Sequence, residues 1–283
     1  MSVSQLGYIG IGVKNMDAWE EYATNLLGCE ISETGSDGTV YLRFDDLHHR
    51  ISLVPTGSDD LEFVGWQTRD LHAFQTVKRN LLDNGIEWEQ GTPEQIEHRK
   101  VTDLIKFSMS GIATEVFYGP LALPETPFNS SIGITGFKTD HLGLGLIALR
   151  VDDPERATTI MRECLGFEVS DIVEHRDVFL YCNLREHTAL IRPYKGEGKR
   201  MDHLRIELDS LDDVGFTLDR ANEHFSIAHS SLGKQTSSRS ISFYMETPSN
   251  FPIQYGWGSD EINPKDRQVK RHDRSRAWGH RGL

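Results

Sequence analysis

The sequence has little cysteine and no long apolar run. Its three cysteines form no CxxC pair, so neither a disulfide framework nor a thiolate zinc site is expected, and we expect reduced, buried thiols at Cys29, Cys164 and Cys182. No apolar run approaches the ~20 residues that cross a bilayer. The first residues lack the basic and apolar regions of a signal peptide. We therefore expect a cytoplasmic protein that has no membrane partner.

Positive charge is scarce as well. The 283 residues include 30 Lys and Arg against 43 Asp and Glu, which gives a net charge of −13. With 26% charged and 37% hydrophobic residues, the composition is typical of a soluble globular protein. The acidic excess makes nucleic acid an unexpected partner. The basic residues that do occur gather between Lys265 and Arg281, which predicts a basic C-terminal tail lying on an acidic body.

An internal repeat organises the chain. At an offset of 138 residues, Gly7–Val13 lies over Gly145–Val151, and Leu27–Ser32 lies over Leu165–Ser170 without a gap. In each copy the apolar positions change from strand spacing to helical spacing and back, so each copy reads as a strand, a helix and several strands. The chain is therefore a duplication of one unit.

The duplication predicts the fold class and the domains. We expect an α+β fold built from duplicated, paired βαβββ modules. In the second copy, Asp153 is the expected N-cap of the first helix and Pro154 its first residue. The predicted parts are an N-terminal structural domain (1–130), a C-terminal pocket-bearing domain (138–260) and the basic tail (261–283).

Several sequence strings carry a family resemblance. They are Leu6-Gly7-Tyr8-Ile9-Gly10, His203-Leu204, Tyr255-Gly256-Trp257-Gly258 and Trp278-Gly279-His280. Together they resemble type I extradiol ring-cleavage dioxygenases of the 2,3-dihydroxybiphenyl dioxygenase kind, within the vicinal oxygen chelate superfamily. The resemblance spans nearly the whole chain. It implies two glyoxalase-like domains, of which the C-terminal one holds the active site.

The resemblance also implies where a metal would bind. In that family two His and one Glu hold a ferrous ion, and the matching positions in this chain are Leu146, His203 and Gln254. Leucine offers no lone pair, and a neutral amide cannot offset the charge of the ion as a carboxylate would. We therefore expect no metal site and no cofactor. Fe(II) would bind only with replacement ligands such as His141 or Glu207.

The first copy gives an independent comparison for these positions. Transferred to the first half, they fall near Tyr8, Phe63 and Phe117, which are all aromatic. This is typical of a copy that never holds metal. The second copy has no aromatic residues at these three positions, so we expect its pocket to persist.

The resemblance implies further site residues. The family's outer His is kept as His187, its acid–base Tyr is kept as Tyr244, and a second His is replaced by Gln235. We expect His187 and Tyr244 to be catalytic, because they can transfer protons near neutral pH or donate to an oxyanion. The expected substrate-binding residues are Leu146, His203, Gln235 and Gln254.

Three functions stay open at this point. The one favoured by the residue content is a metal-independent acid–base enzyme, of isomerase, cyclase or lyase type, that binds an aromatic or phenolic small molecule in its C-terminal domain. The second is a genuine Fe(II) extradiol catechol dioxygenase with unusual ligands. The third is a non-catalytic binding or partner subunit. We also expect a homo-oligomer.

Overall fold

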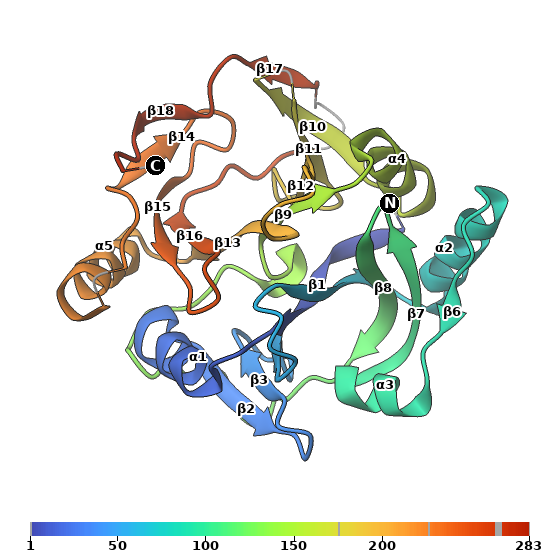
Figure 1. Cartoon of the computed structure of the whole chain (residues 1–283), viewed down its shortest axis with the longest axis horizontal. Coiled ribbons are helices and arrows are strands. Elements are labelled where there is room, and N and C mark those ends of the chain that lie inside the picture. Colours follow the sequence, from blue (N-terminus) through green and yellow to red (C-terminus); the bar gives the residue numbers. More distant parts are fainter. Residues whose placement is uncertain (1, 175, 226, 264–267, 283) are drawn as a thin grey trace.

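A computed structural model describes residues 2–174, 176–225, 227–263 and 268–282. Its described strands form two sheets, one from each half of the chain (Figure 1). The first has the strand order β2-β3-β4-β1-β5-β8-β7-β6, and the second has the order β17-β10-β11-β12-β9-β13-β16-β15-β14-β18. The α+β fold predicted from the repeat is confirmed.

The elements of the first half alternate between strands and short helices. In chain order they are β1 (Val3–Gly12), α1 (Met16–Tyr22), the π-helical turn η1 (Ala23–Leu27), β2 (Glu30–Thr34), β3 (Val40–Arg43), β4 (Ile51–Val54), β5 (Leu61–Thr68), α2 (Leu71–Asp83), β6 (Glu89–Gln90), α3 (Pro93–Arg99), β7 (Val101–Met109) and β8 (Ile112–Pro120).

The second half follows a similar order, without a counterpart of α3 among its described residues, and adds strands at its end. Its elements are η2 (Asp140–Leu142), β9 (Leu146–Val151), α4 (Pro154–Thr159), η3 (Ile160–Cys164), β10 (Glu168–Val173), β11 (Asp177–Tyr181), β12 (Ala189–Pro193), β13 (Met201–Leu208), α5 (Leu211–Arg220), η4 (Ala221–Phe225), β14 (Gly233–Gln235), β15 (Ile241–Glu246), β16 (Pro252–Trp257), β17 (Lys270–His272) and β18 (Arg276–Gly279).

The strand pairing shows the duplication directly. β1 pairs in parallel with β4 and antiparallel with β5, and β9 pairs in the same two ways with β12 and β13. The first helices also begin alike, because Asn15 and Asp153 each accept a hydrogen bond from the backbone N–H three residues ahead. After the π-helical turn, Gly28 and Gly166 both have a φ of 81°, a left-handed conformation that favours glycine.

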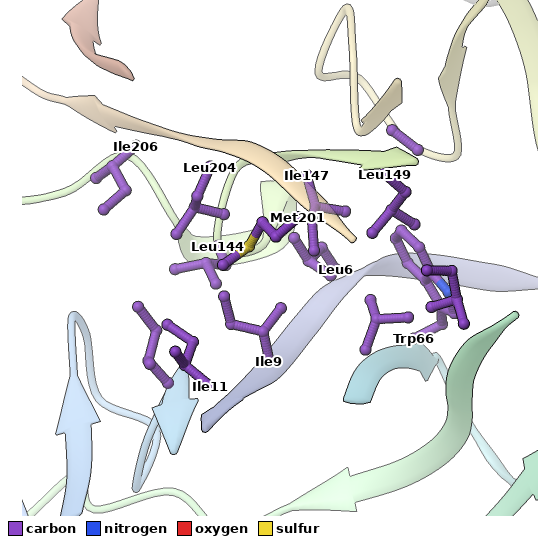
Figure 2. Packing of buried hydrophobic residues seen from close by; sticks show 14 of the residues in the cluster. Leu6, Ile9, Ile11, Trp66, Leu144, Ile147, Leu149, Met201, Leu204 and Ile206 are labelled. Atoms are coloured by element: carbon purple, nitrogen blue, oxygen red, sulfur yellow. The ribbon is translucent and has the colours of Figure 1, made fainter. Parts of the chain in front are cut away.

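The two halves share one hydrophobic core. Leu6 and Ile9 of β1 lie beside Leu144 and Ile147 of the second half (Figure 2), and all four side chains are at most 1% exposed. Cys29, Cys164 and Cys182 are free and buried, as the sequence predicts. In the described part of the chain, no helix is long and apolar enough to cross a membrane.

The basic C-terminal segment contributes strands to the second sheet. β17 pairs in parallel with β10, and β18 pairs antiparallel with β14. The side chain of His280 is fully buried, and its Nε2 lies 2.9 Å from the carbonyl oxygen of Ser242. The described part of this segment thus pairs with strands of the second sheet. Residues 264–267 of the predicted tail lie outside the described residues, and the proposed domain limits stay a prediction.

Candidate functional site

A cavity of about 510 Å³ lies against the second sheet. Its lining includes every site residue that the sequence singled out in the second half: Leu146, His187, His203, Gln235, Tyr244 and Gln254. They come together because β9, β13, β16, β15 and β14, which carry five of them, are neighbours in the sheet in that order, and His187 lies just before the adjoining strand β12. The roles assigned to them remain predictions.

The matching space in the first half is filled by side chains. The rings of Tyr8 and Phe117 stack with centroids 4.4 Å apart, and Phe63 meets Tyr8 edge to face.

The strand register corrects the residue of the first half that corresponds to Gln254. Gly65 pairs with Glu115 as Arg205 pairs with Gln254, so the counterpart of Gln254 is Glu115 rather than Phe117.

The three positions that the resemblance assigns to metal ligands do not form a metal site. Leu146 has no donor atom, and the amide Nε2 of Gln254 donates to Ser242 Oγ at 2.8 Å. His203 Nδ1 lies 2.8 Å from Asp202 Oδ2. The proposed replacements do not complete the set either, because Glu207 forms a buried ion pair with Arg185 and is absent from the cavity wall. His141 is exposed and lies outside this wall.

A different group of ligand atoms lies beside the cavity. One atom each from Asp171, Glu186 and His187 falls within 4.8 Å of the other two, and all three residues are at most 1% exposed. Asp171 Oδ2 lies 2.8 Å from His187 Nε2, and Asp171 Oδ1 lies 3.0 Å from His272 Nε2. Two carboxylates and one imidazole match the donors that divalent iron accepts, and their charge would balance the ion. Because His187 also lines the cavity, this group reaches the cavity wall.

Sequence reasoning identified His187 and missed its two neighbours in the group. Glu186 was visible beside it in the string Arg185-Glu186-His187, but it was not considered as a ligand. Asp171 lies on β10, and His272, which holds it, lies on β17. No spacing rule brings these strands together, because their pairing is a property of the folded sheet.

Burial and charge fix the protonation of two cavity residues. Burial raises the pKa of Tyr244 to about 12, against the opposing charges of Arg192 and Arg205, so its hydroxyl stays protonated at neutral pH. Gln235 Nε2 donates to this hydroxyl oxygen at 3.0 Å. Burial alone would raise the pKa of the Asp202 carboxyl. The hydrogen bond and charge of His203, with the charge of Arg192, outweigh burial and hold that pKa well below its usual value.

The fold and the cavity define a protein of the glyoxalase and dioxygenase superfamily. The family described as "Glyoxalase/Bleomycin resistance protein/Dioxygenase superfamily" matches residues 140–255, and "Dihydroxybiphenyl dioxygenase BphC D1" matches residues 6–56.

Full-length relatives narrow the assignment. The chain is 34% identical to biphenyl-2,3-diol 1,2-dioxygenase of Paraburkholderia xenovorans (strain LB400) over 292 residues, which cover 100% of this chain and 97% of the relative. It is 33% identical to 3-methylcatechol 2,3-dioxygenase of Pseudomonas putida, covering 99% and 98%. A crystal structure of catechol 2,3-dioxygenase superposes with a TM-score of 0.91 at 33% identity, covering 98% and 99%. The chain belongs to the vicinal oxygen chelate extradiol dioxygenases.

These findings correct the function expected from the sequence. A metal-independent isomerase, cyclase or lyase is contradicted by relatives at 34% and 33% identity that are named as dioxygenases of biphenyl-2,3-diol and 3-methylcatechol, and by the ligand group of Asp171, Glu186 and His187. The expectation of no cofactor is likewise unsupported, since a relative from Rhodococcus jostii, 31% identical over 99% of this chain and 97% of its own length, is named an iron-dependent extradiol dioxygenase. Sequence reasoning considered the three family positions, with His141 and Glu207 as replacement ligands, and did not consider Asp171 or Glu186.

Proposed function

We propose that this chain is an Fe(II)-dependent extradiol dioxygenase, which opens the ring of an aromatic compound with two adjacent hydroxyl groups by adding dioxygen. The observation that carries the proposal is the group formed by Asp171, Glu186 and His187, whose ligand atoms lie within 4.8 Å of one another and of which His187 lines a cavity of about 510 Å³. The full-length relatives named above act on such diols by their printed names, which supports the substrate class.

Asp171, Glu186 and His187 would hold the iron in this proposal. Ligation by His187 requires a deprotonated Nε2, so the cation would replace the hydrogen bond between this nitrogen and Asp171. His272 would keep its contact with the other carboxylate oxygen and so orient Asp171. When bound, the ion supplies positive charge and open coordination positions for the diol and dioxygen.

The other cavity residues would bind the diol and handle its protons. Tyr244 keeps its proton at neutral pH and can donate a hydrogen bond to a diol oxygen. Asp202 holds His203 Nδ1 and so orients the ring, whose other nitrogen can form a hydrogen bond with a diol hydroxyl. Leu146, beside Ala148 and Leu190, gives the ring an apolar surface.

Metal analysis of ligand variants tests this proposal. After anaerobic loading with Fe(II) and removal of free metal, the wild-type chain should hold about one iron per chain, and Asp171→Asn and Glu186→Gln should each lose most of it. Glu168→Gln is a matched control, since this exposed carboxylate lies on the same strand as Asp171. Equal iron in all four proteins would contradict the assigned ligands.

A second candidate function is binding of an aromatic diol without turnover. Leu146 and Gln254 favour it, because neither provides the ligand that the family resemblance places there. Calorimetric binding of catechol by the iron-loaded chain, together with no oxygen consumption, would support this candidate over ring cleavage.

A further inference from the structure

Arg205 lies between Leu146 and Gln254, the two positions at which the ligands implied by the family resemblance are missing. In the pairing of β13 with its two neighbours, Arg205 lies opposite Leu146 on β9 and opposite Gln254 on β16. It follows His203 by two residues, so the two side chains project from the same face of the strand. Both line the cavity.

This guanidinium is buried without an ion pair. Arg205 is 3% exposed, its Nε has no hydrogen-bond partner, and its Nη2 lies 3.4 Å from the carbonyl oxygen of His187. Within the described residues, no carboxylate lies within ion-pair distance of it. Burial lowers the pKa of Arg205, yet a guanidinium remains charged in proteins. A buried charge of this kind is costly unless an anion accompanies it.

The other arginines of the cavity have partners. Arg192 forms ion pairs with Asp177 and Asp202, and Arg176 pairs with Glu174. Arg150 also pairs with Asp202. In all, five arginines and three carboxylates of the described chain line the cavity, so its formal charge is positive. Among the described residues, Arg205 itself has no ion pair with a carboxylate, and Glu207, whose charge acts on it, is paired with Arg185.

In the first half, where side chains fill the matching space, an arginine has a carboxylate partner. Arg99 forms a two-pronged ion pair with Glu115, through Nε at 3.0 Å and Nη2 at 2.9 Å. Glu115 is the counterpart of Gln254, and glycine stands at the counterpart of Arg205. Thus the filled copy keeps a carboxylate beside its arginine. The copy with the cavity has a neutral amide at that position.

We propose that Arg205 is an anion-binding residue that selects an aromatic diol carrying a carboxylate. Arg205 lines the cavity, and the paired N–H groups of its planar guanidinium match the two oxygens of a carboxylate. The diol part of this ligand rests on the proposed function, whereas the carboxylate part rests on Arg205 alone. The positive cavity would also concentrate such an anion.

Paired probes that differ only in charge test the proposal. Isothermal titration calorimetry with the full chain compares 2,3-dihydroxybenzoate with 2,3-dihydroxybenzamide, its neutral analogue. We expect the wild-type chain to bind the benzoate about tenfold or more tightly than the amide. Arg205→Gln should abolish that preference. Arg205→Lys should keep part of it, because lysine keeps the positive charge but lacks the planar guanidinium that binds both carboxylate oxygens.

Arg200→Gln is the matched control, since this arginine lies just before the same strand, pairs with Asp152 and is absent from the cavity wall. It should keep the full preference. Equal affinity of the wild-type chain for both probes would overturn the proposal whether or not the variants fold. So would a preference that persists in a folded Arg205→Gln chain. Carboxylate preference without ring cleavage would refute only the proposed function, and ring cleavage without preference would refute only the anion site.

Discussion

Trp19 and Ser249, which are 230 residues apart in the sequence, are joined by a hydrogen bond from the indole Nε1 to the serine Oγ at 2.8 Å. Ser249 Oγ in turn donates to Asp59 Oδ1 at 2.7 Å. Both Trp19 and Ser249 are fully buried. The contact therefore ties the first helix of one half to the connection between β15 and β16 in the other.

Removing the hydroxyl should destabilise the chain. Ser249→Ala leaves the buried indole N–H of Trp19 without its acceptor, which typically costs about 1–3 kcal/mol. Urea unfolding followed by tryptophan fluorescence measures the loss. Ser108→Ala, at an exposed position of β7, should change the free energy of unfolding by less than about 0.5 kcal/mol. Equal effects of the two substitutions would contradict the role of this contact.

The ion pairs of Asp202 should make stability depend on pH in one direction. Its carboxyl pKa is lowered in the folded chain, so its contribution is present above the unfolded value of ~3.9 and is lost as the pH falls through the folded value. Asp202→Asn should therefore cost roughly 2 kcal/mol at pH 7. The difference from wild type should shrink below about pH 4.

Chemical denaturation of the Asp202→Asn and wild-type chains at pH 7, 5 and 3 checks this. An unchanged difference at pH 3 would show that the effect comes from packing instead of ionisation.

Loss of the Tyr244 hydroxyl should reduce turnover while the fold persists. Its protonated hydroxyl is placed to donate to a substrate oxygen, so Tyr244→Phe should lower kcat by roughly 10²-fold. Tyr194→Phe is the control, because Tyr194 is absent from the cavity wall. Steady-state oxygen uptake by the two iron-loaded variants, with catechol as substrate, gives the comparison. Full activity in Tyr244→Phe would remove this residue from the mechanism.

Rebuilding the family ligand positions should reveal the charge of Arg205. Leu146→His with Gln254→Glu places donors around a site already next to a guanidinium. Because two positive charges repel, the double variant should gain little iron. Adding Arg205→Gln should let it bind up to about one further iron per chain. Elemental analysis of both variants decides the point, and equal iron gain would show that Arg205 does not oppose the cation.

The repeat allowed much of the fold to be predicted from the sequence. Gly7–Val13 and Gly145–Val151 become β1 and β9, which have the same neighbours in their sheets. The cavity residues were also identified, because the family resemblance assigned Leu146, His203 and Gln254 to one site, and the structure places them on adjacent strands. The sequence could not show that Asp171 approaches Glu186 and His187, or that Arg205 lacks a carboxylate. Both depend on distances between side chains from separate strands.

The most direct test of the proposed ring cleavage is the oxygen consumed per molecule of diol. Iron-loaded chain is mixed with a limiting amount of catechol in an oxygen electrode, and the ring-opened product is followed by its absorbance. A dioxygenase consumes one dioxygen per diol, with product formed in equal amount, and this is the result we expect. Chain that holds iron and binds catechol but consumes no oxygen would contradict the account.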